Sequence, residues 1–322
     1  MPPLCPRTAT LPRRDVRHSD FLQHEWHAGV QSRDICLETC PRRTGVSDDL
    51  KTLYGGVTSR RVTTRDLQLA KEHGERWAML TSYDMLTAQL FDEIGIPVLL
   101  VGDSAGNNVL GYENTVPVTV DDLLPLVRAV ARSTTRPLVV ADLPFGSYQE
   151  SPAQALRNGV RFLQVGAQAV KLEGGRRVRP QVELLVESGV PVMGHLGLTP
   201  QSVNTLGGYR VQGRGEAGDE LIADALALQE AGAFSLVLEV VPADLAERVT
   251  KELTIPTIGI GAGAGTDAQV LVWTDMAGLT PGPGPKFLKR YADLRGVLGA
   301  AAKEYAEDVR TGRYPADEHG YT

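Results

Sequence analysis

The architecture of this chain follows from the segment Ala169-Val-Lys-Leu-Glu-Gly-Gly175. The segment begins as an apolar strand and ends with two charged residues, Lys171 and Glu173, two positions apart. Residues i and i+2 of a β-strand point to the same face, so these two side chains project together. The paired glycines allow the backbone to turn tightly just afterwards. A strand that aims a cation and an anion into one space builds a site rather than a core.

Similar short apolar runs recur along the chain, separated by segments whose apolar residues have helical spacing. Strands are expected at 77–83, 98–104, 137–143, 169–175, 190–195, 235–241, 256–261 and 269–273. Helices are expected at 62–72, 84–94, 121–133 and 178–188. Three more are expected: one that begins at residue 151, one that ends at residue 231 and one that ends at residue 253. Continuous apolar strands that alternate with helices indicate a parallel sheet covered on both faces.

Eight such units over ~250 residues predict a (β/α)8 barrel, which is typical of the TIM-barrel class. The alternative is an open, doubly wound sheet. The only dinucleotide-type glycine pattern, Gly213 to Gly218, follows a polar loop rather than a strand, which argues against that alternative. We therefore expect residues 57–322 to form a barrel catalytic domain.

An additional helix is expected after Lys286, at the C-terminal end of the barrel domain. Its apolar residues fall roughly on one face: Leu288, Tyr291, Leu294, Leu298, Ala302, Tyr305 and Val309. Such a stripe predicts packing on the side of the barrel or on a neighbouring subunit.

Residues 1–56 form an N-terminal extension that we expect to be disordered. The extension contains all three cysteines (Cys5, Cys36 and Cys40) and also His18, His24 and His27. A zinc site is the alternative, but the cysteine spacing is loose and the surrounding hydrophobic periodicity is weak. We assign no chemistry to this part of the chain.

The formal net charge of the 322 residues is -6, and the first 65 residues are net positive, so the rest is more acidic than the whole. An acidic body argues against broad nucleic-acid binding, which needs basic surface. No apolar run is long enough to cross a bilayer, and the N-terminus lacks the apolar core of a signal peptide. The sequence predicts a cytoplasmic protein without membrane or nucleic-acid partners.

Polar and charged residues mark the ends of the predicted strands, where the active site of a (β/α)8 barrel lies. They are Asp103, Ser104, Asp142, Lys171, Glu173, His195 and Glu239. Any one of them could be a helix cap, an ion-pair partner or a buried histidine. Their coincidence on one rim favours a functional site.

Three of these carboxylates, Asp103, Asp142 and Glu173, come from neighbouring strands and would repel one another without a cation between them. An all-oxygen cluster suits Mg2+, which keeps positions open for water or substrate. Lys171 is suited to neutralise a substrate carboxylate.

Glu239 stands apart from the other carboxylates, between apolar residues on both sides. A carboxylate in apolar surroundings gains proton affinity and can serve as a general base. His195 could orient the substrate or relay a proton. The long polar segment 196–218, which contains Arg210 and Arg214, is expected to act as a lid.

The same residues lie in strings that closely resemble the 3-methyl-2-oxobutanoate hydroxymethyltransferase family, also called ketopantoate hydroxymethyltransferases. The strings are Val-Gly-Asp-Ser (101–104), Ala-Asp-Leu-Pro-Phe (141–145), Val-Lys-Leu-Glu-Gly-Gly (170–175), Gly-His-Leu-Gly-Leu-Thr-Pro-Gln-Ser (194–202), Leu-Glu-Val-Val-Pro (238–242) and Gly-Ile-Gly-Ala-Gly (259–263). The resemblance runs from about residue 61 to residue 314 in unbroken motif order.

The resemblance implies a (β/α)8 barrel that transfers a one-carbon unit from 5,10-methylenetetrahydrofolate to 3-methyl-2-oxobutanoate. The product would be 2-dehydropantoate, in the first step of pantothenate synthesis. The family pattern places the Mg2+ ligands on Asp103, Asp142 and Glu173. It places substrate contacts on Asp103, Ser104, Asp142 and Lys171, and the proton acceptor on Glu239. It also implies a homo-oligomer, commonly a decamer.

Two other functions need to be weighed. A related metal-dependent barrel, such as a phosphoenolpyruvate mutase or an isocitrate-lyase-like enzyme, would also enolise a 2-oxo acid on Mg2+. Such a lyase usually carries a reactive cysteine in a mobile loop, and this chain has no cysteine after Cys40. A non-enzymatic scaffold would be expected to lack one of the four acidic site residues, and none is missing.

Overall fold

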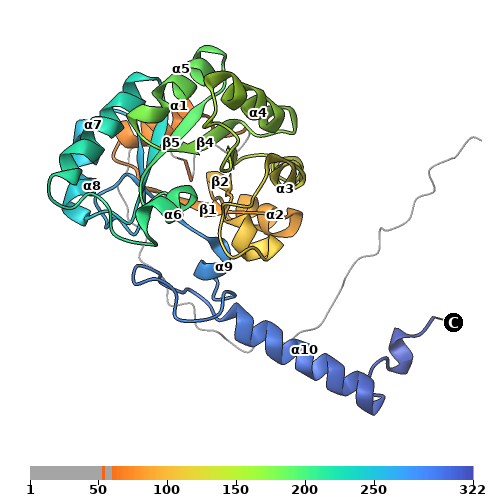
Figure 1. Ribbon diagram of the computed structural model, residues 1–322. Coiled ribbons are helices and arrows are strands. Elements are labelled where there is room, and N and C mark those ends of the chain that lie inside the picture. Colours follow the sequence, from red (N-terminus) through yellow and green to blue (C-terminus); the bar gives the residue numbers. More distant parts are fainter. Residues whose placement is uncertain (1–52, 55–59, 322) are drawn as a thin grey trace, which may run out of the picture. The chain divides into compact units, whose positions relative to one another are not determined.

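Eight parallel strands form a closed barrel in which each strand pairs with the next and β8 pairs with β1 (Figure 1). The computed structural model describes residues 53–54 and 60–321. The strands are β1 (Trp77–Thr81), β2 (Val98–Val101), β3 (Leu138–Asp142), β4 (Ala169–Glu173), β5 (Val192–Gly197), β6 (Ser235–Glu239), β7 (Thr257–Ile260) and β8 (Ala268–Leu271). The closed order confirms the predicted barrel and excludes the open sheet.

Helices follow most of the strands, as the sequence pattern predicts. The α-helices are α1 (Thr64–Glu72), α2 (Met85–Glu93), α3 (Val120–Ser133), α4 (Pro152–Gln164), α5 (Arg179–Glu187), α6 (Val203–Leu206), α7 (Ala217–Glu230), α8 (Ala243–Glu252), α9 (Trp273–Met276) and α10 (Leu294–Thr311). Side-chain caps define where several helices begin. Thr63 and Asp66 form a capping box at the start of α1. Ser151 caps α4, and Pro152 is the first residue of that helix. Every helix among the described residues is too short or too polar to span a bilayer.

Two apolar layers hold the barrel together, because successive residues of a strand face opposite sides. Leu99 and Val139 face outward into the layer between strands and helices. Leu100 and Val140, their neighbours, belong to the smaller cluster inside the barrel. Both faces are therefore buried, which explains why the strands are continuous apolar runs rather than alternating ones.

The expected disorder of residues 1–56 concerns residues that lie outside the described part, apart from Leu53 and Tyr54. Leu53 is buried, and its backbone N–H donates to a carboxylate oxygen of Glu75 at 3.0 Å. The Tyr54 hydroxyl accepts a hydrogen bond from the backbone N–H of Ala78 at 2.7 Å. These two residues contact the barrel, and the domain boundary at residue 57 stays a prediction.

Several predicted elements differ from the structure at their ends. The expected loop after the second strand contains a π-helix, Gly106–Leu110, and the polar segment 196–218 contains a 3-10 turn, Pro200–Ser202, followed by α6. The predicted strand 98–104 ends at Val101, so Asp103 and Ser104 lie in the turn that follows β2. Strand pairing ends where the chain must leave the barrel, and the apolar pattern does not mark that point.

The C-terminal helix begins later than predicted and does not pack on the barrel. Asp293 caps α10 by accepting a hydrogen bond from the N–H of Gly296, so the helix starts at residue 294. The preceding Tyr291 instead donates its backbone N–H to Met276 at 2.9 Å. None of the residues of α10 is buried, so its apolar stripe, including Leu298 and Tyr305, stays exposed. The predicted packing on the side of the barrel is wrong.

Candidate active site

The interior face of the barrel changes from apolar to charged along each strand. On β4, Ala169 belongs to the interior core, and Lys171 and Glu173 follow at the next two inward positions. On β3, Val140 is followed in the same way by Asp142. The predicted alternation therefore holds, and it places the charged groups at the C-terminal end of the barrel.

Strand register brings these groups side by side. Asp142 pairs with Lys171 across β3 and β4, and Glu173 pairs with His195 across β4 and β5. Gly197 pairs with Glu239 across β5 and β6. A Cβ on Gly197 would lie 2.2 Å from the Glu239 carbonyl oxygen, and the φ of Gly197 is +94°, so only glycine allows this approach.

One cavity of about 120 Å3 gathers every predicted site residue. Its lining includes Asp103, Ser104, Asp142, Lys171, Glu173, His195 and Glu239. The structure thus brings together groups that are up to 136 positions apart in the sequence. None of the predicted site residues lies elsewhere.

Lys171 is the central cation of the cavity. Its Nζ lies 2.8 Å from Oδ1 of Asp142, and both side chains are almost completely buried. Burial by itself lowers the pKa of Lys171, but the charges of Asp142, Glu173 and Asp103 outweigh it, so the net shift is upward. Burial raises the pKa of Asp142, although Lys171 opposes that shift. The lysine therefore stays charged throughout the physiological range.

His195 lies between the carboxylate of Glu173 and that of the predicted base, Glu239. Its Nδ1 lies 3.4 Å from Oε1 of Glu173 and 3.4 Å from Nζ of Lys171. Its Nε2 lies 3.3 Å from Oε2 of Glu239. Burial and Lys171 lower the pKa of His195, but its contacts with the two glutamates raise it to about 9. At neutral pH the ring is therefore a cation that faces a carboxylate on each side.

Asp103 and Ser104 reach the cavity from the turn after β2. The backbone N–H of Asp103 donates to Oδ2 of Asp142 at 2.9 Å. The Ser104 hydroxyl lies 2.8 Å from the hydroxyl of Tyr83. Burial, followed by the charges of Asp142 and Glu173, raises the pKa of Asp103 well above its ordinary range. The turn therefore holds a carboxylate where negative charge is in excess.

The donor set fits a hard divalent cation. Four carboxylates line the cavity against two cationic groups, Lys171 and His195, so a bound cation would relieve the excess negative charge. Within residues 53–54 and 60–321, no three acidic, histidine or cysteine side chains gather closely enough to hold an ion by themselves. Mg2+ does not need such a cage, because it keeps several waters and usually takes one or two carboxylates together with substrate oxygens.

Sequence reasoning missed the residues that support the site. Gln201 is buried and donates hydrogen bonds to the carboxylates of Asp103 and Glu173. Tyr148 is buried and donates to Gln201, and Tyr83 contacts Ser104. Partial burial, followed by the charge of Glu239, raises the pKa of Tyr209 in the predicted lid. Gln201 lies within the string Gly194 to Ser202, but a neutral amide in a loop carries no chemical signal in sequence. Only its contacts reveal it.

Backbone strain occurs directly beside the predicted base. Val240 has a φ of 48°, in the left-handed region that β-branched residues rarely adopt. Its N–H donates to the carbonyl of Ile260 at 2.8 Å, and its carbonyl accepts from the N–H of Gln212 at 3.0 Å. These two bonds hold the strained residue in place, and they tie Glu239 to β7 and to the segment that follows α6.

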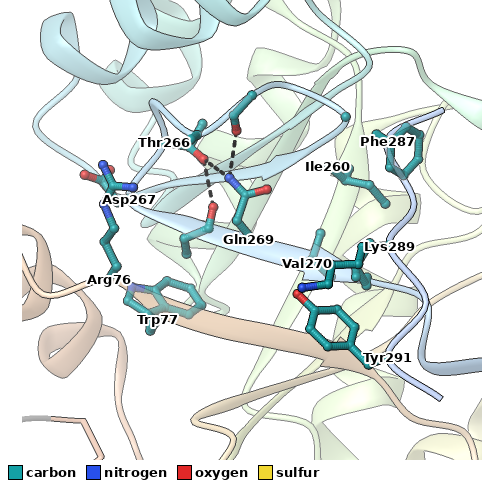
Figure 2. A pocket seen from close by; sticks show the side chains of 15 residues that line it. Arg76, Trp77, Ile260, Thr266, Asp267, Gln269, Val270, Phe287, Lys289 and Tyr291 are labelled. Carbon is teal, nitrogen blue, oxygen red and sulfur yellow. Dashed lines mark hydrogen bonds between the residues drawn. The ribbon is translucent and has the colours of Figure 1, made fainter. Parts of the chain in front are cut away.

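A second and larger cavity, of about 390 Å3, lies on the outside of the barrel beside β1, β7 and β8 (Figure 2). Figure 2 shows Gln269 on its wall, donating from Nε2 to the Thr266 hydroxyl at 2.8 Å. It contains none of the predicted site residues, and no helical residue is among those that line it. It shares only Ile260 and Val270 with the active-site cavity. We therefore place the chemistry in the smaller, charged cavity.

Comparison with solved structures shows the fold class. A phosphonopyruvate hydrolase structure in complex with oxalate and Mg2+ matches with a TM-score of 0.53 at 13% identity, over 80% of this chain and 91% of that one. A 2,3-dimethylmalate lyase matches with a TM-score of 0.52 at 18% identity, over 79% and 89%. Likeness at this level of identity establishes the barrel architecture only.

Comparison with protein families and with curated relatives shows which family the chain belongs to. Residues 61–317 match the family model described as ketopantoate hydroxymethyltransferase. The 3-methyl-2-oxobutanoate hydroxymethyltransferase of Streptomyces coelicolor is 65% identical over 275 residues, covering 85% of this chain and 94% of the relative. Those of Frankia casuarinae and Rhodococcus jostii are 64% and 58% identical, covering 85% and 87% of this chain and 95% and 99% of the relatives. The chain therefore belongs to the ketopantoate hydroxymethyltransferase family.

Proposed function

We propose that this protein transfers a hydroxymethyl group from 5,10-methylenetetrahydrofolate to 3-methyl-2-oxobutanoate and so forms 2-dehydropantoate, the first step of pantothenate synthesis. Membership of the family supports the reaction. The observation that carries the proposal is the single cavity that joins acidic groups, a buried cation and a separate glutamate. An acidic 2-oxo substrate needs all three.

Mg2+ is the proposed cofactor. Asp103, Asp142 and Glu173 are its proposed oxygen ligands, one or two of them bound directly and the rest through the waters that Mg2+ keeps. When bound, it would act as a Lewis acid on the 2-oxo group of the substrate and so acidify the proton on C3. The four carboxylates of the cavity exceed its two cationic groups, Lys171 and His195, by two charges, which supports a divalent cation over a monovalent one.

Glu239 is the proposed general base, which takes the C3 proton of the substrate. Its carboxylate lies apart from Lys171, and its nearest cationic partner is Nε2 of His195 at 3.3 Å. We propose that His195 orients this carboxylate, since the ring is itself held between Glu173 and Lys171. Loss of the proton leaves an enolate, and its C3 forms a bond to the methylene carbon supplied by the folate. Both C–N bonds of that carbon break to release tetrahydrofolate, and one water is consumed to supply the hydroxyl oxygen of the product.

Lys171 and Ser104 are proposed to hold the substrate carboxylate. Asp103 and Asp142 are proposed to contact the substrate at the metal side. Burial of Lys171 strengthens its attraction for an anion, because little water screens it. The segment 196–218 is the proposed lid, which would separate the cavity from bulk solvent while the enolate forms.

The functional unit is proposed to be a homo-oligomer, a decamer as in the family resemblance, located in the cytoplasm. The exposed apolar stripe of α10 supports self-association, because apolar side chains gain by being covered.

The reaction can be tested in two steps by NMR in D2O. Wild-type enzyme with Mg2+ and 3-methyl-2-oxobutanoate, without folate, should exchange the C3 proton for deuterium. Glu239→Gln should abolish the exchange, because an amide cannot accept the proton. Addition of methylenetetrahydrofolate to the wild type should then convert the substrate to 2-dehydropantoate.

Glu183→Gln is a matched control, since Glu183 lies in α5 and pairs with Arg179 away from the cavity. It should exchange at the wild-type rate. Exchange that persists in Glu239→Gln would remove Glu239 from the role of base. Absence of exchange in the wild type would contradict the enolisation mechanism.

A further inference from the structure

Gln201 is a buried polar side chain to which the reaction described above gives no role. It lies in the turn Pro200–Ser202, directly after β5 and at the start of the proposed lid, and it is 4% exposed. A buried amide has two donors and two acceptor lone pairs to satisfy. The hydrogen bonds of the Gln201 side chain therefore indicate its role.

Both donors of this amide are used at the acidic side of the cavity. Nε2 donates to Oδ2 of Asp103 at 2.8 Å and to the carbonyl of Leu143 at 3.0 Å. A carbonyl can only accept, so the nitrogen must face this pair, and the orientation of the amide is fixed. Gln201 thus holds one oxygen of Asp103 and leaves the other oxygen, Oδ1, without a contact from this amide.

The backbone of the same residue holds a second carboxylate. The N–H of Gln201 donates to Oε2 of Glu173 at 3.1 Å. The oxygen of the side-chain amide lies 2.8 Å from the hydroxyl of Tyr148, which in turn accepts from the backbone N–H of Glu173 at 3.1 Å. One loop residue is therefore hydrogen-bonded to two carboxylates that come from the turn after β2 and from β4.

We propose that Gln201 is a positioning residue that sets the geometry of Asp103 and Glu173 for the cation and, through the same bonds, anchors the lid to the metal site. The inference rests on the metal role proposed above. Gln201 itself touches no reacting atom. A neutral donor is suited to this position, because a carboxylate there would repel both partners and an aliphatic side chain would leave Asp103 without its donor.

Gln201→Met tests the proposal, because it keeps the length of the side chain and removes both donors. Mg2+ binding to the substrate-free enzyme, measured by isothermal titration calorimetry, should weaken about 10- to 100-fold, as is usual when a hydrogen bond that orients a ligand is lost. Backbone amides of residues 198–202 should exchange hydrogen faster than in the wild type. Neither measurement requires turnover.

Gln212→Met is the matched control, since Gln212 lies in the same segment and, among the described residues, its side-chain nitrogen donates only to the carbonyl of Arg210. It should bind Mg2+ like the wild type. If Gln201→Met does not fold, Tyr148→Phe removes the hydroxyl that holds the amide oxygen and should weaken Mg2+ binding about fivefold.

The outcomes separate this inference from the proposed function. Wild-type Mg2+ affinity in a folded Gln201→Met, or in Tyr148→Phe if the former does not fold, would overturn the positioning role while leaving the metal in place. A wild type that binds no Mg2+ would overturn both. Weakened binding in Gln201→Met supports the positioning role even in an enzyme that fails to transfer the hydroxymethyl group.

Discussion

Lys171 shows how strongly a single residue of this site affects the whole chain. Its ammonium group is buried against Asp142 and within the field of Glu173 and Asp103. Removing one partner of a buried pair leaves the other charge uncompensated, which lowers the unfolding free energy by about 3–5 kcal/mol. Lys171→Met should therefore unfold with a free energy lower by about this amount. The measurement is urea unfolding in EDTA at a fixed protein concentration.

Mg2+ should restore part of the stability of Lys171→Met, since a divalent cation replaces the lost positive charge. The gain from Mg2+ is expected to be larger in this variant than in the wild type. Lys251→Met is the control: Lys251 pairs with Glu247 on the surface, where such a pair contributes at most about 1 kcal/mol. A loss in EDTA no greater than that of the control would contradict the role of Lys171 as the central cation.

The prediction for Val240 concerns the position of the Glu239 side chain rather than its charge. Its left-handed φ costs about 1–2 kcal/mol, and glycine would relieve that strain but lose roughly 0.5–1 kcal/mol through the entropy of the unfolded chain. From these two terms, Val240→Gly should leave the unfolding free energy unchanged or raise it by up to about 1.5 kcal/mol. Substrate C3 exchange should nevertheless slow by about tenfold or more, because the backbone that aims Glu239 becomes free to move.

Val240→Ala separates the backbone effect from the loss of side chain. Alanine also loses the γ-methyl groups but keeps the Cβ that restricts φ, so its exchange rate should stay close to the wild type. Equal rates in the glycine and alanine variants would mean that the strained backbone does not position Glu239.

At the scale of elements, the first helix depends on its capping box. The Thr63 side chain accepts from the N–H of Asp66, and the Asp66 carboxylate accepts from the N–H of Thr63 at 2.8 Å. A hydrogen bond from Arg60 is the main cause that lowers the pKa of Asp66 to about 2. Asp66→Ala should cost about 1 kcal/mol of unfolding free energy at neutral pH.

The sign of the pH dependence follows from the depressed pKa. The carboxylate of Asp66 stabilises the folded state above its ordinary pKa of 3.8, and the contribution disappears as pH falls toward about 2. The difference between wild type and Asp66→Ala, measured by urea unfolding, should therefore shrink across that window. Arg60→Ala should cost less, since Arg60 is exposed. A difference that is constant with pH would show that the carboxylate charge does not act.

Helix α10 belongs to the scale of the whole molecule, because nothing in the described chain covers its apolar stripe. Leu298 and Tyr305 are 55% and 60% exposed. If a second copy covers them, Leu298→Asp should lower the sedimentation coefficient by shifting the oligomer toward smaller species. Lys303→Asp is the control, since Lys303 is an exposed residue of the same helix outside the apolar stripe. A wild type that sediments as a monomer would contradict the proposed oligomer.

The sequence by itself determined the barrel and its charged rim. Inward positions of a strand recur every second residue, so Lys171 and Glu173 had to share a face, and the apolar runs had to be covered on both sides. The motif strings around Asp103, Asp142 and Glu239 determined the family. These features are local in the chain, and local periodicity and composition are what a sequence displays.

Only the tertiary structure decided how the site is supported. Gln201 reaches Asp103 across 98 positions, and His195 stands between two glutamates from different strands. The strain at Val240 and the uncovered face of α10 are likewise absent from any sequence pattern. Such contacts depend on strand register and on where turns return the chain. Those are set by the balance of packing over the whole barrel rather than by neighbouring residues.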